Sequence, residues 1–337
     1  MRRVLLLGIA VGLVSAGVAA GQDASVVYFE GDPVIRNAAG DSQFLDFGTS
    51  VIVGESVVTG SRDFVELAQG AATTIRVDPD TVFTVQEREV DGQRQSVLTT
   101  AAGSVAYRFN RIAGREEPRV GSMSVVAGIR GTELTVYAGP DGSTLFLVEE
   151  GAVAVSSAGA TVELGADQGV EVAAGAAPGE PFSLLGREFD YGSWEAGRRD
   201  AFLTDPLGAT AGHATQLQQF AAEMQTWVER FEAARVLSDE AIETMRGIAD
   251  ATERLNYRNE VWAPLSRQTG TTILNYRFYA LSALSFKRYV IGPSYMEMKT
   301  RNILAPTPEY TAYLEAYEAI VREFDAVFEP YLEDFDR

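Results

Sequence analysis

The chain has 337 residues, a formal net charge of −19 and no cysteine. Its length favours two domains, and an apolar content of 46% is enough for each to form a core. The acidic charge excludes nucleic acid as an expected partner, because binding to phosphate depends on an excess of lysine and arginine. The lack of cysteine excludes disulfides, thiol nucleophiles and zinc–thiolate sites.

The N-terminus has the order of a secretory signal peptide. Arg2 and Arg3 precede an apolar run at residues 4–14, and small residues follow, with Val18 and Ala20 in the −3 and −1 positions of a cleavage site. The apolar run is shorter than the roughly twenty residues that a spanning helix needs. We therefore expect cleavage near Ala20 and a periplasmic or secreted mature protein without a transmembrane segment. Retention of the uncleaved segment as an anchor stays open.

The first half of the sequence is typical of β-structure. Thr73–Val77 alternates polar and apolar residues, as a half-buried strand does, whereas residues 144–148 are apolar on both faces. Hairpin turns are expected at Asp91-Gly92 and Asp141-Gly142, because glycine tolerates the positive φ of such turns. These closely spaced strands predict an all-β domain over residues 21–175, of solenoid or sandwich type.

Four motifs follow one another in this half. They read Gly-Glu-Ser-Val-Val-Thr-Gly at residues 54–60, Gly-Ile-Arg-Gly-Thr-Glu-Leu at 128–134, Val-Glu-Glu-Gly-Ala-Val at 148–153 and Val-Glu-Leu-Gly-Ala-Asp-Gln-Gly at 162–169. In this order they resemble the FecR-domain family, over about residues 25–175. The resemblance implies an all-β, solenoid-like domain outside the cytoplasm.

The best-known proteins of that family relay the occupancy of an outer-membrane transporter to a sigma factor. They carry a cytoplasmic segment and a spanning helix before the β-domain, whereas here a signal peptide leads almost directly into the first strand. We therefore expect recognition of an envelope protein or ligand, as a scaffold or signalling module, without direct sigma-factor regulation.

The second and third motifs contain residues for which structural and binding roles compete. Those expected to be structural, through backbone bends or local hydrogen bonds, are Gly128, Gly131, Thr132 and Gly151. Arg130 and Glu133 point to opposite faces of a regular strand, but a bend between them allows an ion pair or a contact with a ligand.

After residue 175 the sequence changes character. Residues 176–189 are rich in proline and glycine and predict a linker, and residues 190–337 predict an all-α helical bundle. Apolar residues spaced three or four apart from Leu217 to Ala234 indicate the face of one helix. Ser238, followed by two acidic residues, is expected to cap the next helix.

Prolines divide the rest of the helical half. Pro264 is expected to end the helix that Ser238 caps, and Gly292-Pro293 is expected to end a third helix over residues 271–290. Thr307 is expected to cap the last helix, with Pro308 at its first position. An apolar stripe from Tyr310 to Phe328 then predicts a last helix.

No arrangement of catalytic residues is apparent. His213 is the only histidine, and it has neither a nucleophile-elbow motif nor other zinc-ligand types beside it. Glu149 and Glu150 are adjacent on a predicted strand and face opposite ways, so they cannot act as a converging pair. Asp78 and Asp80 flank a proline without the spacing of a calcium loop. We expect no enzyme activity, no cofactor and no metal site.

Aromatic residues are concentrated in the helical half, which holds all three tryptophans. The residues that combine tyrosine with arginine, as interfaces do, are Tyr257, Arg258, Tyr276 and Arg277. An alternative function is therefore binding of the cell wall or a glycan by the aromatic helical domain. A competing interpretation is that Tyr310, Tyr313 and Tyr317 fill the core of the last helix.

Overall fold

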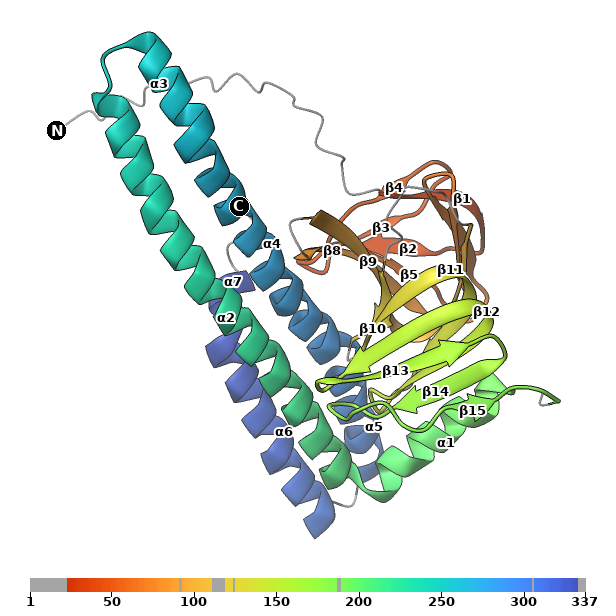
Figure 1. Ribbon diagram of the computed structural model, residues 1–337. Helices are drawn as coiled ribbons and strands as arrows, with labels where there is room; N and C mark the ends of the chain where they lie inside the picture. The colour runs from red at the N-terminus through yellow and green to blue at the C-terminus, as the bar shows by residue number, and fades with distance from the viewer. Residues whose placement is uncertain are drawn as a thin grey trace.

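The structure is a computed structural model that describes residues 23–90, 93–110, 119–123, 125–186, 189–304 and 306–332. A β-domain is followed by helices, which confirms the expected order of β then α (Figure 1). The signal-peptide residues up to Ala20 and the Asp91-Gly92 turn lie outside the described residues.

The described strands form one 15-stranded sheet that curls around an apolar core. Their bounds are β1 (Ala24–Glu30), β2 (Val34–Arg36), β3 (Ser42–Phe44), β4 (Ser50–Val51), β5 (Ser56–Val58), β6 (Phe64–Gln69), β7 (Thr73–Val77), β8 (Val82–Val90), β9 (Gln93–Phe109), β10 (Arg119–Ser122), β11 (Val126–Ala138), β12 (Thr144–Ser157), β13 (Ala160–Gly165), β14 (Gln168–Val172) and β15 (Phe182–Ser183). The pairs are antiparallel except that of β9 with β10. This pairing does not show the solenoid that the family resemblance implies.

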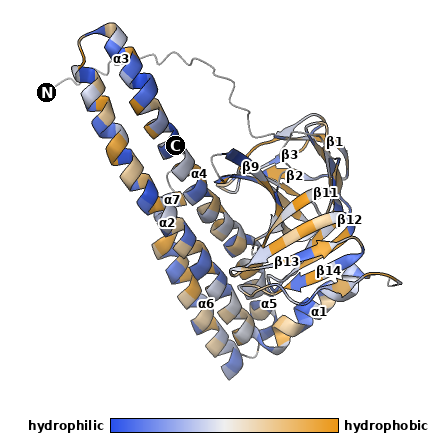
Figure 2. Cartoon of the chain, viewed as in Figure 1, coloured by the Kyte–Doolittle hydropathy of each residue, from blue (hydrophilic) through white to orange (hydrophobic). Residues whose placement is uncertain are grey.

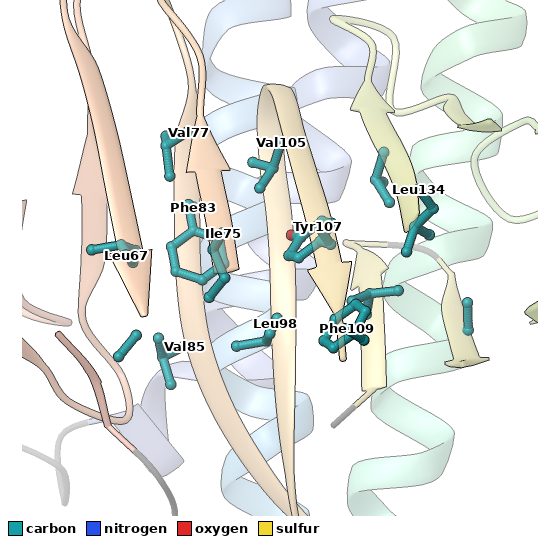
Figure 3. Close-up of a cluster of buried hydrophobic side chains, with 14 of the residues drawn as sticks. Leu67, Ile75, Val77, Phe83, Val85, Leu98, Val105, Tyr107, Phe109 and Leu134 are labelled. Carbon is teal, nitrogen blue, oxygen red and sulfur yellow. The ribbon is translucent and has the colours of Figure 1, made fainter. Parts of the chain in front are cut away.

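The core of the β-domain forms from the alternation that the sequence contains. In β7, Thr73, Ile75 and Val77 are buried and the residues between them are exposed, as expected. The first five residues of β12 are all buried, which confirms a strand covered on both faces. Figure 3 shows side chains from β6, β7, β8, β9 and β11 meeting in this core, among them Phe83, Tyr107 and Leu134.

The expected hairpin turn between β11 and β12 is also present. Gly142 has a φ of 82°, and its N–H donates to the carbonyl oxygen of Gly139 at 3.0 Å. Ala138 and Thr144 pair on either side of the turn. The positive φ explains why glycine stands at this position.

The helices follow in a long antiparallel arrangement. Their bounds are α1 (Tyr191–Thr204), α2 (Pro206–Gly247), α3 (Ala251–Tyr257), the π-helical turn η1 (Arg258–Trp262), α4 (Ala263–Phe286), the π-helical turn η2 (Lys287–Ile291), α5 (Gly292–Asn302), α6 (Pro308–Val327) and α7 (Glu329–Leu332). With 42 residues, α2 is about 63 Å long. It contacts both α4 and α6.

The expected helix start at Ser238 is wrong, because α2 continues past it to Gly247. Ser238 is buried, as are Ala234 four residues before it and Ala241 three residues after it. This spacing places three small residues on one face of α2, where they permit close contact with the helix opposite. The helix ends at residue 247, and Asp250 caps α3 by accepting from the N–H groups of Thr252 and Glu253.

The expected helix ends at Pro264 and Gly292-Pro293 are wrong as well. Each proline follows a π-helical turn by two residues, and the helical path continues through both. The N–H of Ala263 donates to Arg258, and that of Gly292 donates to Lys287, five residues earlier in each case. The wider turn relieves the clash between a proline ring and the carbonyl four residues before it.

The remaining local expectations concern α6 and the linker. The Thr307 hydroxyl accepts from the N–H of Tyr310 at 3.1 Å, which confirms the cap of α6. Tyr310 and Tyr313 are buried, which confirms their packing in the core. Within the segment expected to be a linker, residues 182–183 form β15 and pair with β14.

The β-domain and the helices share a second apolar core. Val82, Ala101 and Met123 of the β-domain pack in it with buried helical side chains such as Phe220 and Phe286. α4 lies against β8, as Figure 1 shows. The two halves therefore form one packed body. Over the described residues, no helix combines the length and the apolar character needed to cross a membrane.

Candidate interaction surface

The signature motif of the first half forms a bulge between β11 and β12. The register shifts between Arg130 and Glu133. Gly131 has a φ of 57° and Gly151 a φ of 86°, and a Cβ on Gly151 would lie against the Gly131 carbonyl oxygen and 2.8 Å from the Thr132 hydroxyl. Only glycine suits such a close approach at positive φ.

The structure also shows how Thr132 and Gly128 of the motif contribute to the pairing of β11 with β12. The Thr132 hydroxyl donates to the carbonyl oxygen of Ala152 at 3.1 Å, so this bond crosses from β11 to β12. Gly128 pairs with Ala154 in the regular ladder, and its φ is not positive. The expected bend at Gly128 is therefore wrong, because the bulge begins two residues later.

The bulge also decides the partner of Glu133. Arg108 of β9 donates to its carboxylate through Nε at 3.1 Å and Nη2 at 2.6 Å. This bidentate pair joins β9 and β11 on an exposed face of the sheet. The side chain of Arg130 lies outside what the structure describes.

Two more carboxylates lie beside this pair. Glu150 is opposite Glu133 in the register, and Glu149 is the additional residue where the register shifts again. Burial and the neighbouring Glu133 raise the pKa of the Glu149 carboxyl, while Arg108 lowers it. Among the residues that the structure describes, no group of histidine or carboxylate side chains could hold a metal ion.

The only histidine of the chain has a structural environment. His213 is buried, packs edge-on against Phe286 at 5.5 Å between ring centroids, and lies with Nε2 2.9 Å from the carbonyl oxygen of Asp141. Burial lowers its pKa. As a neutral imidazole it donates from Nε2 and ties α2 to the β11–β12 turn.

The four tyrosine and arginine candidates of the helical half do not form one site. Tyr276 is half-buried, with its ring 5.6 Å from that of Phe231, and Arg277 beside it is exposed. Tyr257 and Arg258 lie 19 residues earlier on the same helical path, so about 28 Å separates the two pairs. The two pairs share a tyrosine–arginine sequence, but they lie too far apart to bind one small ligand together.

The outer end of the helical hairpin is the feature that the sequence patterns missed. The hairpin consists of α2 with α3, η1 and α4, and Figure 1 shows its outer end standing clear of the β-domain. No residue of α3 or η1 is buried. Exposed apolar side chains on this end are Val236, Leu237, Leu255 and Val261, which are 52%, 49%, 46% and 37% exposed.

These four residues define the hairpin tip. Figure 2 shows hydrophobic and hydrophilic residues mixed along this part of the hairpin. An apolar residue that faces solvent on a projecting element is available to a partner, because no other described element covers it. A break in the apolar periodicity of α2 at Val236 and Leu237 is the sequence signal that indicates this position.

Comparison with known protein families matches one part of the first half of the chain. Residues 55–154 match the family model described as FecR protein, which confirms the FecR domain expected there. None of the curated proteins matches the chain.

Two crystal structures of a candidate anti-sigma factor from Parabacteroides distasonis are similar to part of the chain. Their TM-scores are 0.32 and 0.31, at 13% and 12% sequence identity, and each alignment covers 38% of this chain and 59% of that chain. The chain thus spans less than two thirds of the protein it matches. Neither the family match nor these structures support the expectation that direct sigma-factor regulation is absent.

Proposed function

We propose that the protein is a non-enzymatic recognition module of the cell envelope, with a regulatory or signalling role, which binds a partner protein through the hairpin tip. The observation that carries this proposal is the hairpin tip itself: four exposed apolar residues at the end of an element that projects from a packed body. A projecting apolar surface suits a protein partner, since its burial stabilises association.

The FecR domain supports the regulatory part of the proposal. It is joined to the helices by a shared apolar core and by hydrogen bonds such as that of Arg288 with the carbonyl oxygen of Ala38 at 3.0 Å. A partner bound at the tip is therefore linked to the β-domain through one packed body. The location outside the cytoplasm rests on the signal-peptide pattern at residues 1–20.

A protein partner fits the tip better than a glycan does. Glycan binding needs exposed aromatic faces, whereas Tyr313 is buried and Tyr317 stacks on Tyr295 with 4.4 Å between ring centroids. None of the three tryptophans is exposed. Tyr313 and Tyr317 are therefore part of the helical packing, and Trp194 packs against Tyr137 of the β-domain.

Site-specific photo-crosslinking in intact cells tests the proposal. A photoreactive residue at Leu237 or Leu255 should give one discrete crosslinked protein, which mass spectrometry then identifies. The matched control is Gln218, an exposed residue of α2 nearer the β-domain. The double variant Val236→Ser with Val261→Ser should abolish the crosslink without changing the melting temperature, because both side chains are exposed.

Comparison of the crosslinks from the tip and from Gln218, together with N-terminal sequencing of the fractionated protein, decides between the possible outcomes. Equal crosslinking from Gln218, or none from either tip position, contradicts the proposal. Recovery of the mature N-terminus after residue 20 in the periplasmic fraction supports the location, and recovery in the cytoplasm contradicts it. A crosslinked sigma factor overturns the expectation that the protein does not regulate one directly.

A further inference from the structure

A cleft between the β-domain and the helices has the features of a ligand site. Its volume is about 650 Å³, within the range of small-molecule sites. On one side it is lined by residues of β8, β10, β11 and β12, and on the other by residues of α2 and α4. Glu223 and Gly159 at its edge are exposed, so the cleft is open to solvent.

Two arginines line this cleft in a chain of strongly acidic composition. Arg88 comes from β8 and Arg119 from β10. They are close enough that Arg119 lowers the pKa of the Arg88 guanidinium, although burial is the larger cause. Two neighbouring cations in one cavity repel each other, and a bound anion would remove that repulsion.

Neither arginine forms a salt bridge with a carboxylate among the residues described, although the charge of Glu223 and a hydrogen bond with Tyr279 both raise the pKa of Arg88. Arg119 donates through Nε to the side-chain oxygen of Gln95 at 2.8 Å, a neutral acceptor. The Nε of Arg88 is buried and has no hydrogen-bond partner in the described part of the chain. A buried donor without a partner costs stability, which binding of an acceptor would recover.

The remaining walls provide an acidic group and an apolar surface. Glu223 and Arg88 both affect Tyr279, whose pKa is raised by burial first and by Glu223 second. The guanidinium carbon Cζ of Arg88 lies over the ring of Phe278, 5.6 Å from the ring centroid. Phe220, Met123 and Val125 complete the apolar lining.

We propose that this cleft binds a small organic acid with one carboxylate and an apolar body. Arg88 and Arg119 together with Glu223 leave one net positive charge, which a single carboxylate balances. The planar guanidinium groups accept a carboxylate by paired hydrogen bonds. The apolar body then packs on Phe220 and Phe278. This site is independent of the hairpin tip, which belongs to the outer end of the hairpin.

Isothermal titration calorimetry with 4-phenylbutyrate tests the site directly, with the corresponding amide, amine and phenyl phosphate as comparison probes. We expect 4-phenylbutyrate to bind, the amide and amine to bind at least tenfold more weakly, and phenyl phosphate to bind more weakly because of its second charge. Arg119→Gln should weaken binding at least tenfold. Arg246→Gln, which removes an exposed arginine at the end of α2, should leave the affinity unchanged.

Arg88→Lys is a second variant, because it keeps the charge and loses the paired hydrogen bonds. We expect it to weaken binding while circular dichroism and the melting temperature show a folded protein. Equal affinity for the acid and its amide, or unchanged affinity in Arg119→Gln, would overturn the proposal. Tighter binding of phenyl phosphate than of the acid would contradict the single-carboxylate assignment.

Discussion

Two glycines explain the central signature motif at the level of single residues. Gly131 and Gly151 face each other at the bulge of β11 and β12, and both have positive φ. The bulge turns Glu133 toward Arg108 on the neighbouring strand. The motif therefore has a structural explanation: the glycines permit the bulge, and Glu133 at the bulge forms an ion pair with Arg108.

Gly151→Ala should lower the free energy of unfolding by about 2–4 kcal/mol, because the added Cβ meets the backbone of the opposite strand as well as an unfavourable φ. Gly48→Ala is the matched control, since Gly48 has a φ of 73° and open space around it. We expect that control to cost about 1 kcal/mol. Urea denaturation followed by circular dichroism measures both, and equal losses would contradict the steric argument.

At the level of elements, α4 completes the open edge of β8. β5 pairs only with Val82–Thr84 of that strand, and no other strand of the described residues lies beside the rest of this edge. Asn275 of α4 accepts from the N–H of Glu89 at 2.8 Å and donates to its carbonyl oxygen at 3.1 Å. One amide side chain thus replaces the paired hydrogen bonds of a neighbouring strand.

Asn275→Ala should lower the free energy of unfolding by about 2 kcal/mol, because two backbone groups of Glu89 lose their partner. Asn259→Ala, on the exposed face of η1, should change it by less than about 0.5 kcal/mol. Chemical denaturation provides the comparison. A loss in Asn275→Ala no greater than in the control would show that water replaces the amide at no cost.

At the level of the whole molecule, the joint between the halves contains the buried His213. Burial lowers the pKa of its imidazole, and the hydrogen bond to the Asp141 carbonyl and the charge of Asp141 raise it by less. The unfolded chain therefore binds a proton at higher pH than the folded chain does. The stability that the neutral His213 contributes is fully present above about pH 6.5. It decreases as the pH falls from there toward the lower pKa of the folded state.

We expect the melting temperature of the native protein to fall between pH 7 and pH 5 more steeply than that of His213→Gln, because glutamine carries no proton to bind. Differential scanning calorimetry at several pH values isolates the histidine, since the other titratable groups are common to both proteins. Parallel pH profiles for the two proteins would show that the imidazole stays neutral or becomes protonated without cost.

The sequence by itself determined the features that depend on local spacing. Alternation in Thr73–Val77 and the three-four spacing from Tyr310 onward predict elements that the structure confirms, because side-chain direction repeats every two residues in a strand and every 3.6 in a helix. The ordered motifs of the first half likewise identified the FecR domain that the family model confirms over residues 55–154.

Only the tertiary structure decided what depends on residues distant in the chain. Ser238 does not cap a helix because packing against the opposite helix favours continuation, and Pro264 does not end one because a π-helical turn accommodates its ring. The cleft joins Arg88 and Arg119 to α2 and α4, which begin 87 or more residues further along the chain. No local pattern contains such a contact, because the shared core of the two halves creates it.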